Sequence, residues 1–136
     1  MTEIMKKRAT GRAEVKSFEV KPFNQQAGGP TLYNLELTES FHGDIEGENQ
    51  GRSLRAVGID GSGSYVGFGR VVGRVGNQSG SFLLQVQGTF TSNHVLGEWF
   101  IVPNSGTGEL KGLRGEGSFS THLGQPGEIW LDYWFE

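Results

Sequence analysis

A glycine-rich run at residues 104–117 constrains the fold of this chain more than any other segment. It reads Asn-Ser-Gly-Thr-Gly-Glu-Leu-Lys-Gly-Leu-Arg-Gly-Glu-Gly, with five glycines between residues 106 and 117. Glycine at this density costs backbone entropy in any regular element. It is tolerated where strands bend tightly or where backbones approach closely, as at the corners of a small β-barrel. The run therefore favours a compact, strongly curved β-structure.

Hydrophobic and polar residues alternate along most of the chain, a period of two that is typical of β-strands. In the segment 31–41, for example, Leu35, Leu37 and Phe41 share one face, and Glu39 interrupts that face. The alternation predicts strands at residues 12–20, 31–41, 51–59, 63–75, 79–90 and 93–103, another where the glycine-rich run leads into 118–121, and a last one at 128–136. Residues 21–30 form the longest expected loop.

About eight short strands with regular turn signals, such as Asp60-Gly61, are typical of a barrel or a sandwich. One apolar face per strand, with glycines at the bends, favours the barrel. A chain of 136 residues suits one domain. We therefore expect a single all-β domain over residues 1–136, an eight-stranded antiparallel barrel whose first nine residues are frayed.

Composition excludes several classes of function. The formal charge is −3 and the basic residues are scattered, whereas nucleic-acid binding needs a basic patch. There is no cysteine, which excludes disulfides, thiolate metal sites and thiol catalysis. No secretory signal or membrane-length apolar run is visible. We expect a cytoplasmic protein with no nucleic-acid or membrane partner.

The glycine-rich run also resembles a known signature, Ser-Gly-Thr-Gly-Glu-Leu followed by Gly-Leu-Arg-Gly-Glu-Gly. It is that of a bacterial family of unknown function grouped with the allene oxide cyclase-like barrels. Further matches lie at residues 41–48, 80–85 and 131–136. The resemblance implies a calycin-like barrel of allene oxide cyclase type, like that of dirigent proteins. Such barrels hold an apolar reactive molecule in the lumen, steer its cyclisation or coupling without a metal or organic cofactor, and usually form oligomers.

This chain departs from the family pattern at the inner face. Members often carry a carboxylate where this chain has Gly69, and His or Glu where it has Val86. Ser53 and Val57 stand where aromatic residues are expected. If polar side chains at positions 69 and 86 take part in chemistry in relatives, this protein lacks that chemistry. The smaller residues Ser53 and Val57 imply a wider pocket.

Two charged residues fall on faces that are otherwise apolar. Glu39 shares a face with Leu37 and Phe41, and Arg55 shares one with Ser53. A carboxylate inside a barrel is costly unless it is paired. Glu39 and Arg55 lie on consecutive expected strands, so they can pair across the sheet as a polar anchor or a general acid–base. The alternatives are a salt bridge at the rim or a shifted register that places both side chains in solvent.

Aromatic residues form the expected wall of the lumen, where they can contact an apolar ligand and where tyrosine hydroxyls can donate hydrogen bonds. The candidate ligand-binding residues are Tyr65, Phe82, Val86, Trp99, Tyr133 and Phe135. The alternative is a packed core with no pocket. Phe100, Trp130 and Trp134 fall on the outward face, which suggests subunit packing in a homo-oligomer.

The three histidines, His42, His94 and His122, lie near expected strand ends without metal-binding spacing, so no metal site is expected. Three hypotheses remain. The protein binds a small apolar molecule, it is a cofactor-independent cyclase or isomerase that acts on such a molecule, or it is a structural subunit with a filled barrel. The sequence leaves open whether the protein is an enzyme.

Overall fold

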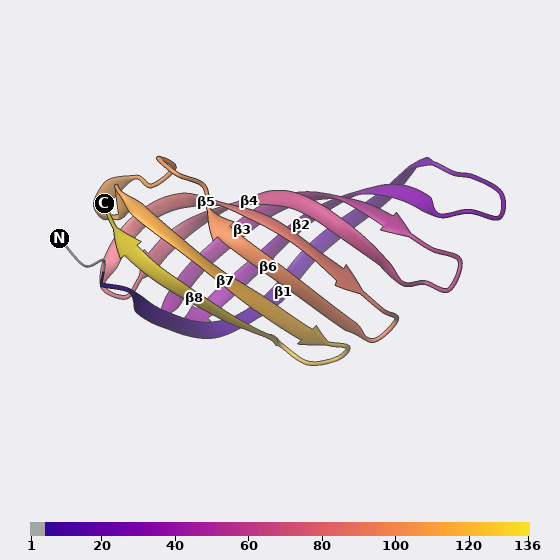
Figure 1. Ribbon diagram of the computed structural model, residues 1–136. Helices are drawn as coiled ribbons and strands as arrows, with labels where there is room; N and C mark the ends of the chain where they lie inside the picture. The colour runs from indigo at the N-terminus through magenta and orange to yellow at the C-terminus, as the bar shows by residue number, and fades with distance from the viewer. Residues whose placement is uncertain (1–4) are drawn as a thin grey trace.

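The computed structural model describes residues 5–136, which form a closed barrel of eight antiparallel strands (Figure 1). Each strand pairs with its neighbours in sequence, and β8 returns to pair with β1. The strands are β1 (Lys7–Asn24), β2 (Thr31–Gly43), β3 (Ile45–Val57), β4 (Gly63–Val75), β5 (Gln78–Phe90), β6 (His94–Ile101), β7 (Leu113–His122) and β8 (Gly127–Phe135). One short 3₁₀ helix, η1 (Gly108–Leu110), precedes β7. The prediction of an all-β, eight-stranded antiparallel barrel is confirmed.

Several predicted boundaries are wrong. The first nine residues are not all frayed, because β1 begins at Lys7 and Ala9 is only 1% exposed; residues 1–4 lie outside the described part of the chain. The expected loop at 21–30 is shorter than predicted, since β1 continues to Asn24 and β2 begins at Thr31. The third strand begins at Ile45 rather than at residue 51, because the polar alternation of Glu46, Glu48 and Gln50 is that of an outward strand face.

The end of the barrel that holds both termini is filled with side chains. Its core contains the largest fully buried residues, which come from seven strands and η1: Phe41, Ile45, Val71, Val75, Phe82, Ile101, Leu110, Leu113 and Leu131. Phe41 meets Trp99 edge to face, with ring centroids 5.8 Å apart. Burial of apolar area at about 25 cal/mol per Å² is the main force that stabilises this end.

The glycine-rich run supplies part of that core instead of a barrel corner. After β6 ends, Val102 donates to the Leu83 carbonyl at 2.9 Å and Thr107 donates to the Ser81 carbonyl at 2.9 Å. The segment thus covers the part of β5 that β6 leaves unpaired, and η1 then inserts Leu110, which is fully buried. A Cβ on Gly80 would lie 1.9 Å from the Thr107 carbonyl oxygen, so glycine permits this close approach.

The other end of the barrel is only partly closed. β1 pairs with β8 from Lys7 to Ala13, and beyond Ala13 it pairs with β2 alone. This leaves one edge of β1 free, and the β1–β2 hairpin projects far from the termini (Figure 1). The edge carries an irregularity between Val15 and Ser17, and Pro22 near its end. A bulge and a proline both discourage further strand pairing, so this edge is protected against addition of another strand.

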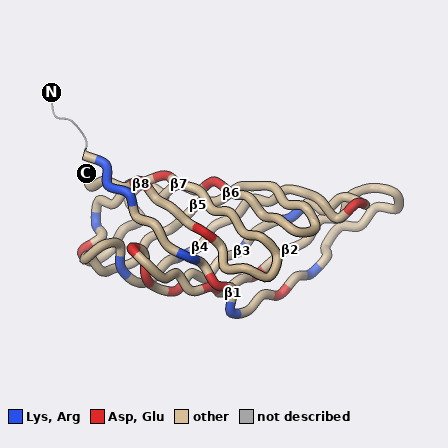
Figure 2. The backbone as a smooth tube through the Cα atoms, turned by 90° about the horizontal axis from the view of Figure 1, so that it is seen from below, with Lys and Arg blue, Asp and Glu red and all other residues tan. Residues whose placement is uncertain are grey.

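Charged residues of both signs are interspersed around the outside of the barrel (Figure 2). The best-formed ion pair joins Arg8 on β1 to Asp132 on β8, with two hydrogen bonds of 2.7 and 2.9 Å. Because it crosses the seam that closes the barrel, it supports the short β1–β8 pairing. Among residues 5–136, no helix has both the length and the apolar character needed to cross a membrane.

Close contact between β3, β4 and β5 depends on a row of glycines, Gly47, Gly73 and Gly80, which face one another across the strands. A Cβ on Gly73 would lie 1.9 Å from the Glu46 carbonyl oxygen, which is backbone and cannot move aside. We expect Gly73→Ala to lower the free energy of unfolding by about 1–3 kcal/mol, measured by urea denaturation.

Gly29→Ala in the β1–β2 turn is the matched control. A Cβ there would meet only the flexible Gln26 side chain, so the change should stay within about 0.5 kcal/mol. Equal effects at the two positions would contradict a steric role for Gly73.

Candidate functional site

The open end of the barrel encloses a cavity of about 490 Å³. Its walls are mainly apolar side chains that point inward from β1, β2, β6 and β7, among them Val15, Phe18, Leu35, Leu37, Val95 and Phe119. Polar side chains also line it, among them Glu39, Asn49, Arg55 and Tyr65. An apolar cavity with a few convergent polar groups is the usual form of a small-molecule site.

Glu39 and Asn49 form the polar pair at the inner part of the cavity. They are direct partners in the β2–β3 register, and the Asn49 Nδ2 donates to Glu39 Oε1 at 2.9 Å. Burial raises the pKa of the Glu39 carboxyl, and the hydrogen bond from Asn49 opposes that rise. The Asn49 Oδ1 is buried and has no partner among the described residues. The pair therefore holds a carboxyl that keeps its proton more readily than usual, beside a free acceptor.

Gly69 explains how Asn49 fits. A Cβ at position 69 would lie 2.3 Å from the Asn49 Oδ1, so the amide occupies the space that a side chain on β4 would need. An amide from the neighbouring strand, β3, therefore lies where a side chain at position 69 would extend. The inner face thus keeps a polar group that position 69 alone does not reveal.

Arg55 lies towards the open end, where its guanidinium covers two aromatic rings. The guanidinium carbon is 4.6 Å from the ring centroid of Phe90 and 5.7 Å from that of Tyr65. Its Nε is buried without a partner among residues 5–136. Burial lowers the pKa of Arg55 and raises that of the Tyr65 hydroxyl, which donates to the Leu96 carbonyl at 3.1 Å.

The predicted ion pair between Glu39 and Arg55 is wrong. Glu39 faces Asn49 across β2 and β3, whereas Arg55 faces Tyr33. Asn49 and Arg55 are six residues apart on β3, which corresponds to about 20 Å along a strand. Alternation placed both charges on the inner face correctly, but only the register fixes how far apart they lie.

The predicted ligand-binding residues divide into two groups. Tyr65, Val86 and Trp99 line the cavity. Phe82 and Tyr133 are buried in the filled end and do not contribute to the cavity wall, and Phe135 is 38% exposed and packs edge-on against Tyr133. Periodicity shows which face a residue occupies but not its depth along the barrel.

Asn49 is a polar site residue that the sequence analysis does not identify. It lies on the same face as Ser53 and Arg55, at even spacings of four and six residues, so the alternation of β3 contains the signal. The predicted strand begins at residue 51 and therefore excludes Asn49.

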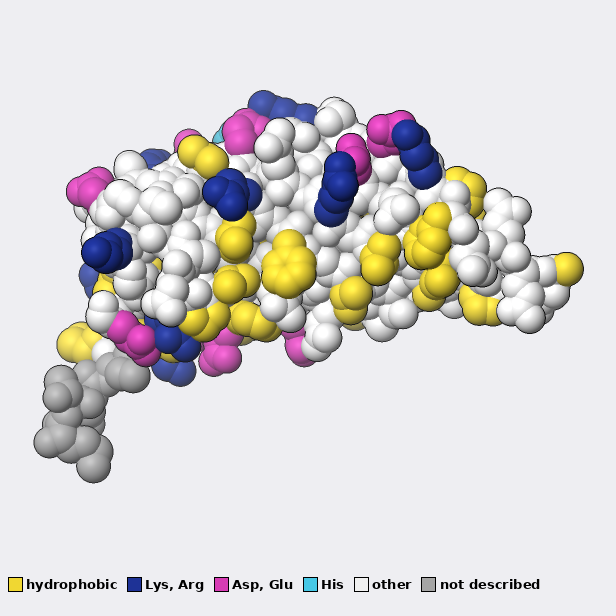
Figure 3. Space-filling model, turned by 90° about the horizontal axis from the view of Figure 1, so that it is seen from above, with side chains coloured by type: hydrophobic (Ala, Val, Ile, Leu, Met, Phe, Trp, Pro, Cys, Tyr) yellow, Lys and Arg dark blue, Asp and Glu magenta, His cyan; other side chains and the backbone are white. Residues whose placement is uncertain are grey.

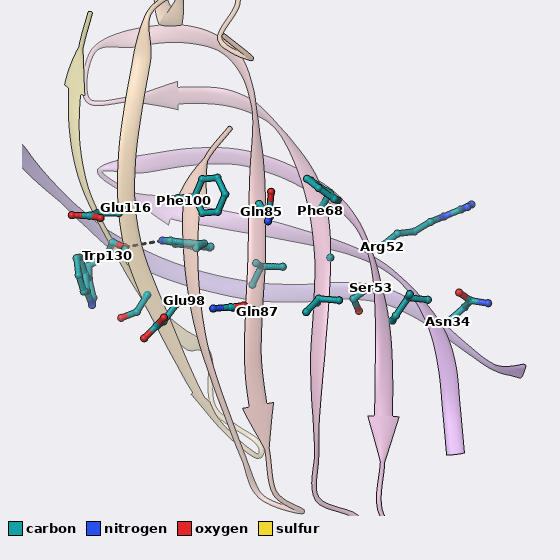
Figure 4. Close-up of a pocket in the computed structure, with 17 residues that line it drawn as sticks. Asn34, Arg52, Ser53, Phe68, Gln85, Gln87, Glu98, Phe100, Glu116 and Trp130 are labelled. Carbon is teal, nitrogen blue, oxygen red and sulfur yellow. Dashed lines mark hydrogen bonds between the residues drawn. The ribbon is translucent and has the colours of Figure 1, made fainter. Parts of the chain in front are cut away.

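The outward tryptophans have partners within the chain. The Arg8 guanidinium covers Trp130 at 4.3 Å and the Lys6 ammonium covers Trp134 at 4.9 Å, so subunit packing is not needed to explain them. The outer face also carries a groove of about 870 Å³. Arg52 lies towards one end of it and Glu98 and Glu116 towards the other (Figure 4).

The histidines lie at strand ends, as expected. His94 and His122 face each other across β6 and β7 and stack, with ring centroids 4.1 Å apart, and the His94 Nε2 is 2.9 Å from the Ser120 hydroxyl. In the part of the chain that the structure describes, no three histidine or acidic side chains gather into a metal-binding group.

Comparison with known proteins agrees with this fold. Residues 9–133 match the family model described as "Protein of unknown function (DUF3224)". The chain is also similar to a crystal structure from Shewanella oneidensis MR-1, a protein of unknown function from the same family. That match has 32% sequence identity and a TM-score of 0.78, and it covers 97% of this chain and 99% of the other. No curated protein matches.

Glu39 should make stability depend on pH in a defined direction. Because its pKa in the folded state is raised above the ordinary 4.5, the fold loses stability as the pH rises from 4.5 to the folded pKa, and the loss is complete above that pKa. Below 4.5 both states are protonated and the penalty disappears. Each pH unit between the two pKa values is worth about 1.4 kcal/mol.

We therefore expect Glu39→Gln, relative to wild type, to be more stabilising at about pH 8 than at about pH 4, as measured by urea unfolding at both pH values. Glu36→Gln, an exposed position on the same strand that pairs with Arg52, is the control for removal of a charge from β2. An identical effect of Glu39→Gln at both pH values would show that the carboxyl is not perturbed by burial.

Proposed function

This chain belongs to DUF3224, a family of proteins of unknown function, and we propose that it binds a small, largely apolar molecule in the lumen of its barrel. The observation that carries the proposal is the cavity of about 490 Å³, which has apolar walls and a few inward polar groups. A cavity of this volume is in the range of small-molecule sites.

The entrance to the cavity supports the same proposal. Phe18 is 67% exposed and Leu123 is 79% exposed, and both line the cavity on either side of the gap between β1 and the β7–β8 turn. Exposed apolar side chains around a cavity are unfavourable in water, and an apolar ligand would cover them.

We propose further that this barrel is of the allene oxide cyclase and dirigent type, in which the lumen is the site of function. On that likeness a second candidate is a cyclase or isomerase that needs no metal or organic cofactor. Glu39 favours it, because a buried carboxyl with a raised pKa can donate a proton inside an apolar cavity. Arg55 would then face developing negative charge. Glu39→Gln separates the candidates, since it removes the acid while leaving the apolar walls intact.

The third candidate, a structural subunit with a filled barrel, fits the structure less well. The core fills the end of the barrel that holds the termini, but the cavity occupies the other end.

We also propose a homo-oligomer in which a second copy packs on the outer groove. Exposed hydrophobic side chains form a band on one outer face of the molecule (Figure 3). Among the exposed hydrophobic residues, Leu54, Val66, Phe68 and Phe100 line the groove. Because Arg52 and the acidic Glu98 and Glu116 lie towards opposite ends, a two-fold axis would place opposite charges against each other.

Ligand binding is tested with N-phenyl-1-naphthylamine, a neutral apolar dye whose fluorescence rises in apolar surroundings. We expect wild type to bind the dye, and Val86→Trp to weaken binding by about tenfold or more, because the indole fills the cavity. Val72→Trp is the matched control on the outer face of β4 and should leave binding unchanged.

Leu35→Trp, on the opposite wall, serves as a second cavity-filling variant if Val86→Trp fails to fold. Absence of dye binding to wild type, or equal binding to the cavity and surface variants, would refute a ligand-binding lumen.

The oligomer is tested by size-exclusion chromatography with light scattering. We expect wild type to be dimeric or larger and Val66→Asp to be monomeric, because a buried unpaired carboxylate costs several kcal/mol at an interface. Val72→Asp, which is on the same strand but outside the groove, should leave the oligomer intact. A monomeric wild type would overturn the proposal.

A further inference from the structure

We propose that the ligand of this barrel is an anionic amphiphile whose charged head binds Arg55 near the open end while its apolar body lies along the inner walls. This inference rests on the proposed ligand-binding function and specifies the chemical class of the ligand.

Arg55 is a cation without a counter-charge inside the lumen. Its guanidinium is held over Phe90 and Tyr65, and the ion pairs found among residues 5–136 do not include it. Glu39 is the one carboxylate among the residues that line the cavity, and it hydrogen-bonds to Asn49 at the far side. The other arginine at the cavity edge, Arg52, pairs with Glu36 on the outside.

A cation in this position favours an anion over a neutral ligand. Its planar group presents several N–H donors, and a carboxylate can accept two of them at once. The aromatic rings fix the guanidinium in place, so little side-chain entropy is lost when the anion binds. The buried Nε, which lacks a partner, identifies a donor that such a head group can satisfy.

The distribution of polar groups sets the orientation of the ligand. Arg55 lies near the open end, Glu39 and Asn49 lie deeper, and Leu35, Leu37 and Phe18 line the wall between them. A head group at Arg55 therefore places an apolar chain against these side chains. The free Asn49 Oδ1 can accept a hydrogen bond from a hydroxyl group at the inner end of that chain.

The test compares decanoate with decanol as competitors for bound N-phenyl-1-naphthylamine at about pH 8, where an alkyl carboxylate is ionised. The two competitors share a chain length and differ in charge. We expect decanoate to displace the dye at lower concentration than decanol from wild type. Arg55→Gln should weaken decanoate by about ten- to a hundredfold and leave decanol unchanged, the range expected for a hydrogen bond to a charged group.

Two variants control for general effects. Arg70→Gln removes an exposed positive charge from the outer face of β4 and should change neither competitor. Arg55→Lys keeps the charge without the planar group and should retain a preference for decanoate, and it remains informative if Arg55→Gln does not fold.

The outcomes separate this inference from the proposal beneath it. If the dye does not bind wild type, the ligand-binding lumen itself fails. If the dye binds and both competitors displace it equally from wild type and Arg55→Gln, the lumen stands and the anionic ligand is refuted.

Discussion

The short pairing between β1 and β8 is the constraint on which the rest of the structure depends. It closes the barrel from Lys7 to Ala13, where all eight strands surround a narrow interior. Beyond Ala13, β1 pairs with β2 alone, so the barrel is open on one side at this end. One end is packed as a protein core, whereas the other end, where β1 and β8 no longer pair, holds the cavity. The filled end and the open end with its cavity therefore both follow from the short β1–β8 pairing.

Glycine makes both halves possible by letting backbones and side chains approach closely. At the filled end, Gly80 admits the segment that carries Leu110 into the core. In the cavity, Gly69 leaves room for the Asn49 amide and so for the polar pair with Glu39. Gly80 thus contributes to stability and Gly69 to the candidate site, although both are glycines within strand-like sequence.

The sequence was sufficient to predict the fold class and the inner face of most strands. Period-two alternation reports side-chain direction directly, which is why Glu39, Arg55 and Tyr65 were all placed inside. It does not report the position of a residue along the barrel axis. The prediction therefore places Phe82 and Tyr133 in a ligand site, whereas they belong to the core of the filled end. Depth depends on stagger between strands and on where the barrel closes, and both are set by long-range pairing.

Register was the second quantity that local pattern could not supply. The shared inner face of adjacent strands predicts that Glu39 and Arg55 pair, yet the residue opposite Glu39 is Asn49. The glycine-rich run illustrates the same limit, because its composition predicted tight curvature while its role as a cover for β5 depends on where β6 ends.

Burial disfavours the charged form of both Glu39 and Arg55, but the two side chains respond differently. It disfavours the ionised form of both, raising the pKa of Glu39 and lowering that of Arg55. A carboxyl can respond by keeping its proton, whereas a guanidinium stays charged at any physiological pH. The cavity thus tends towards a positive charge, which among residues 5–136 is offset by the faces of Phe90 and Tyr65. Aromatic rings replace part of the lost hydration but supply no negative charge, so the remaining imbalance is one that a bound anion can remove.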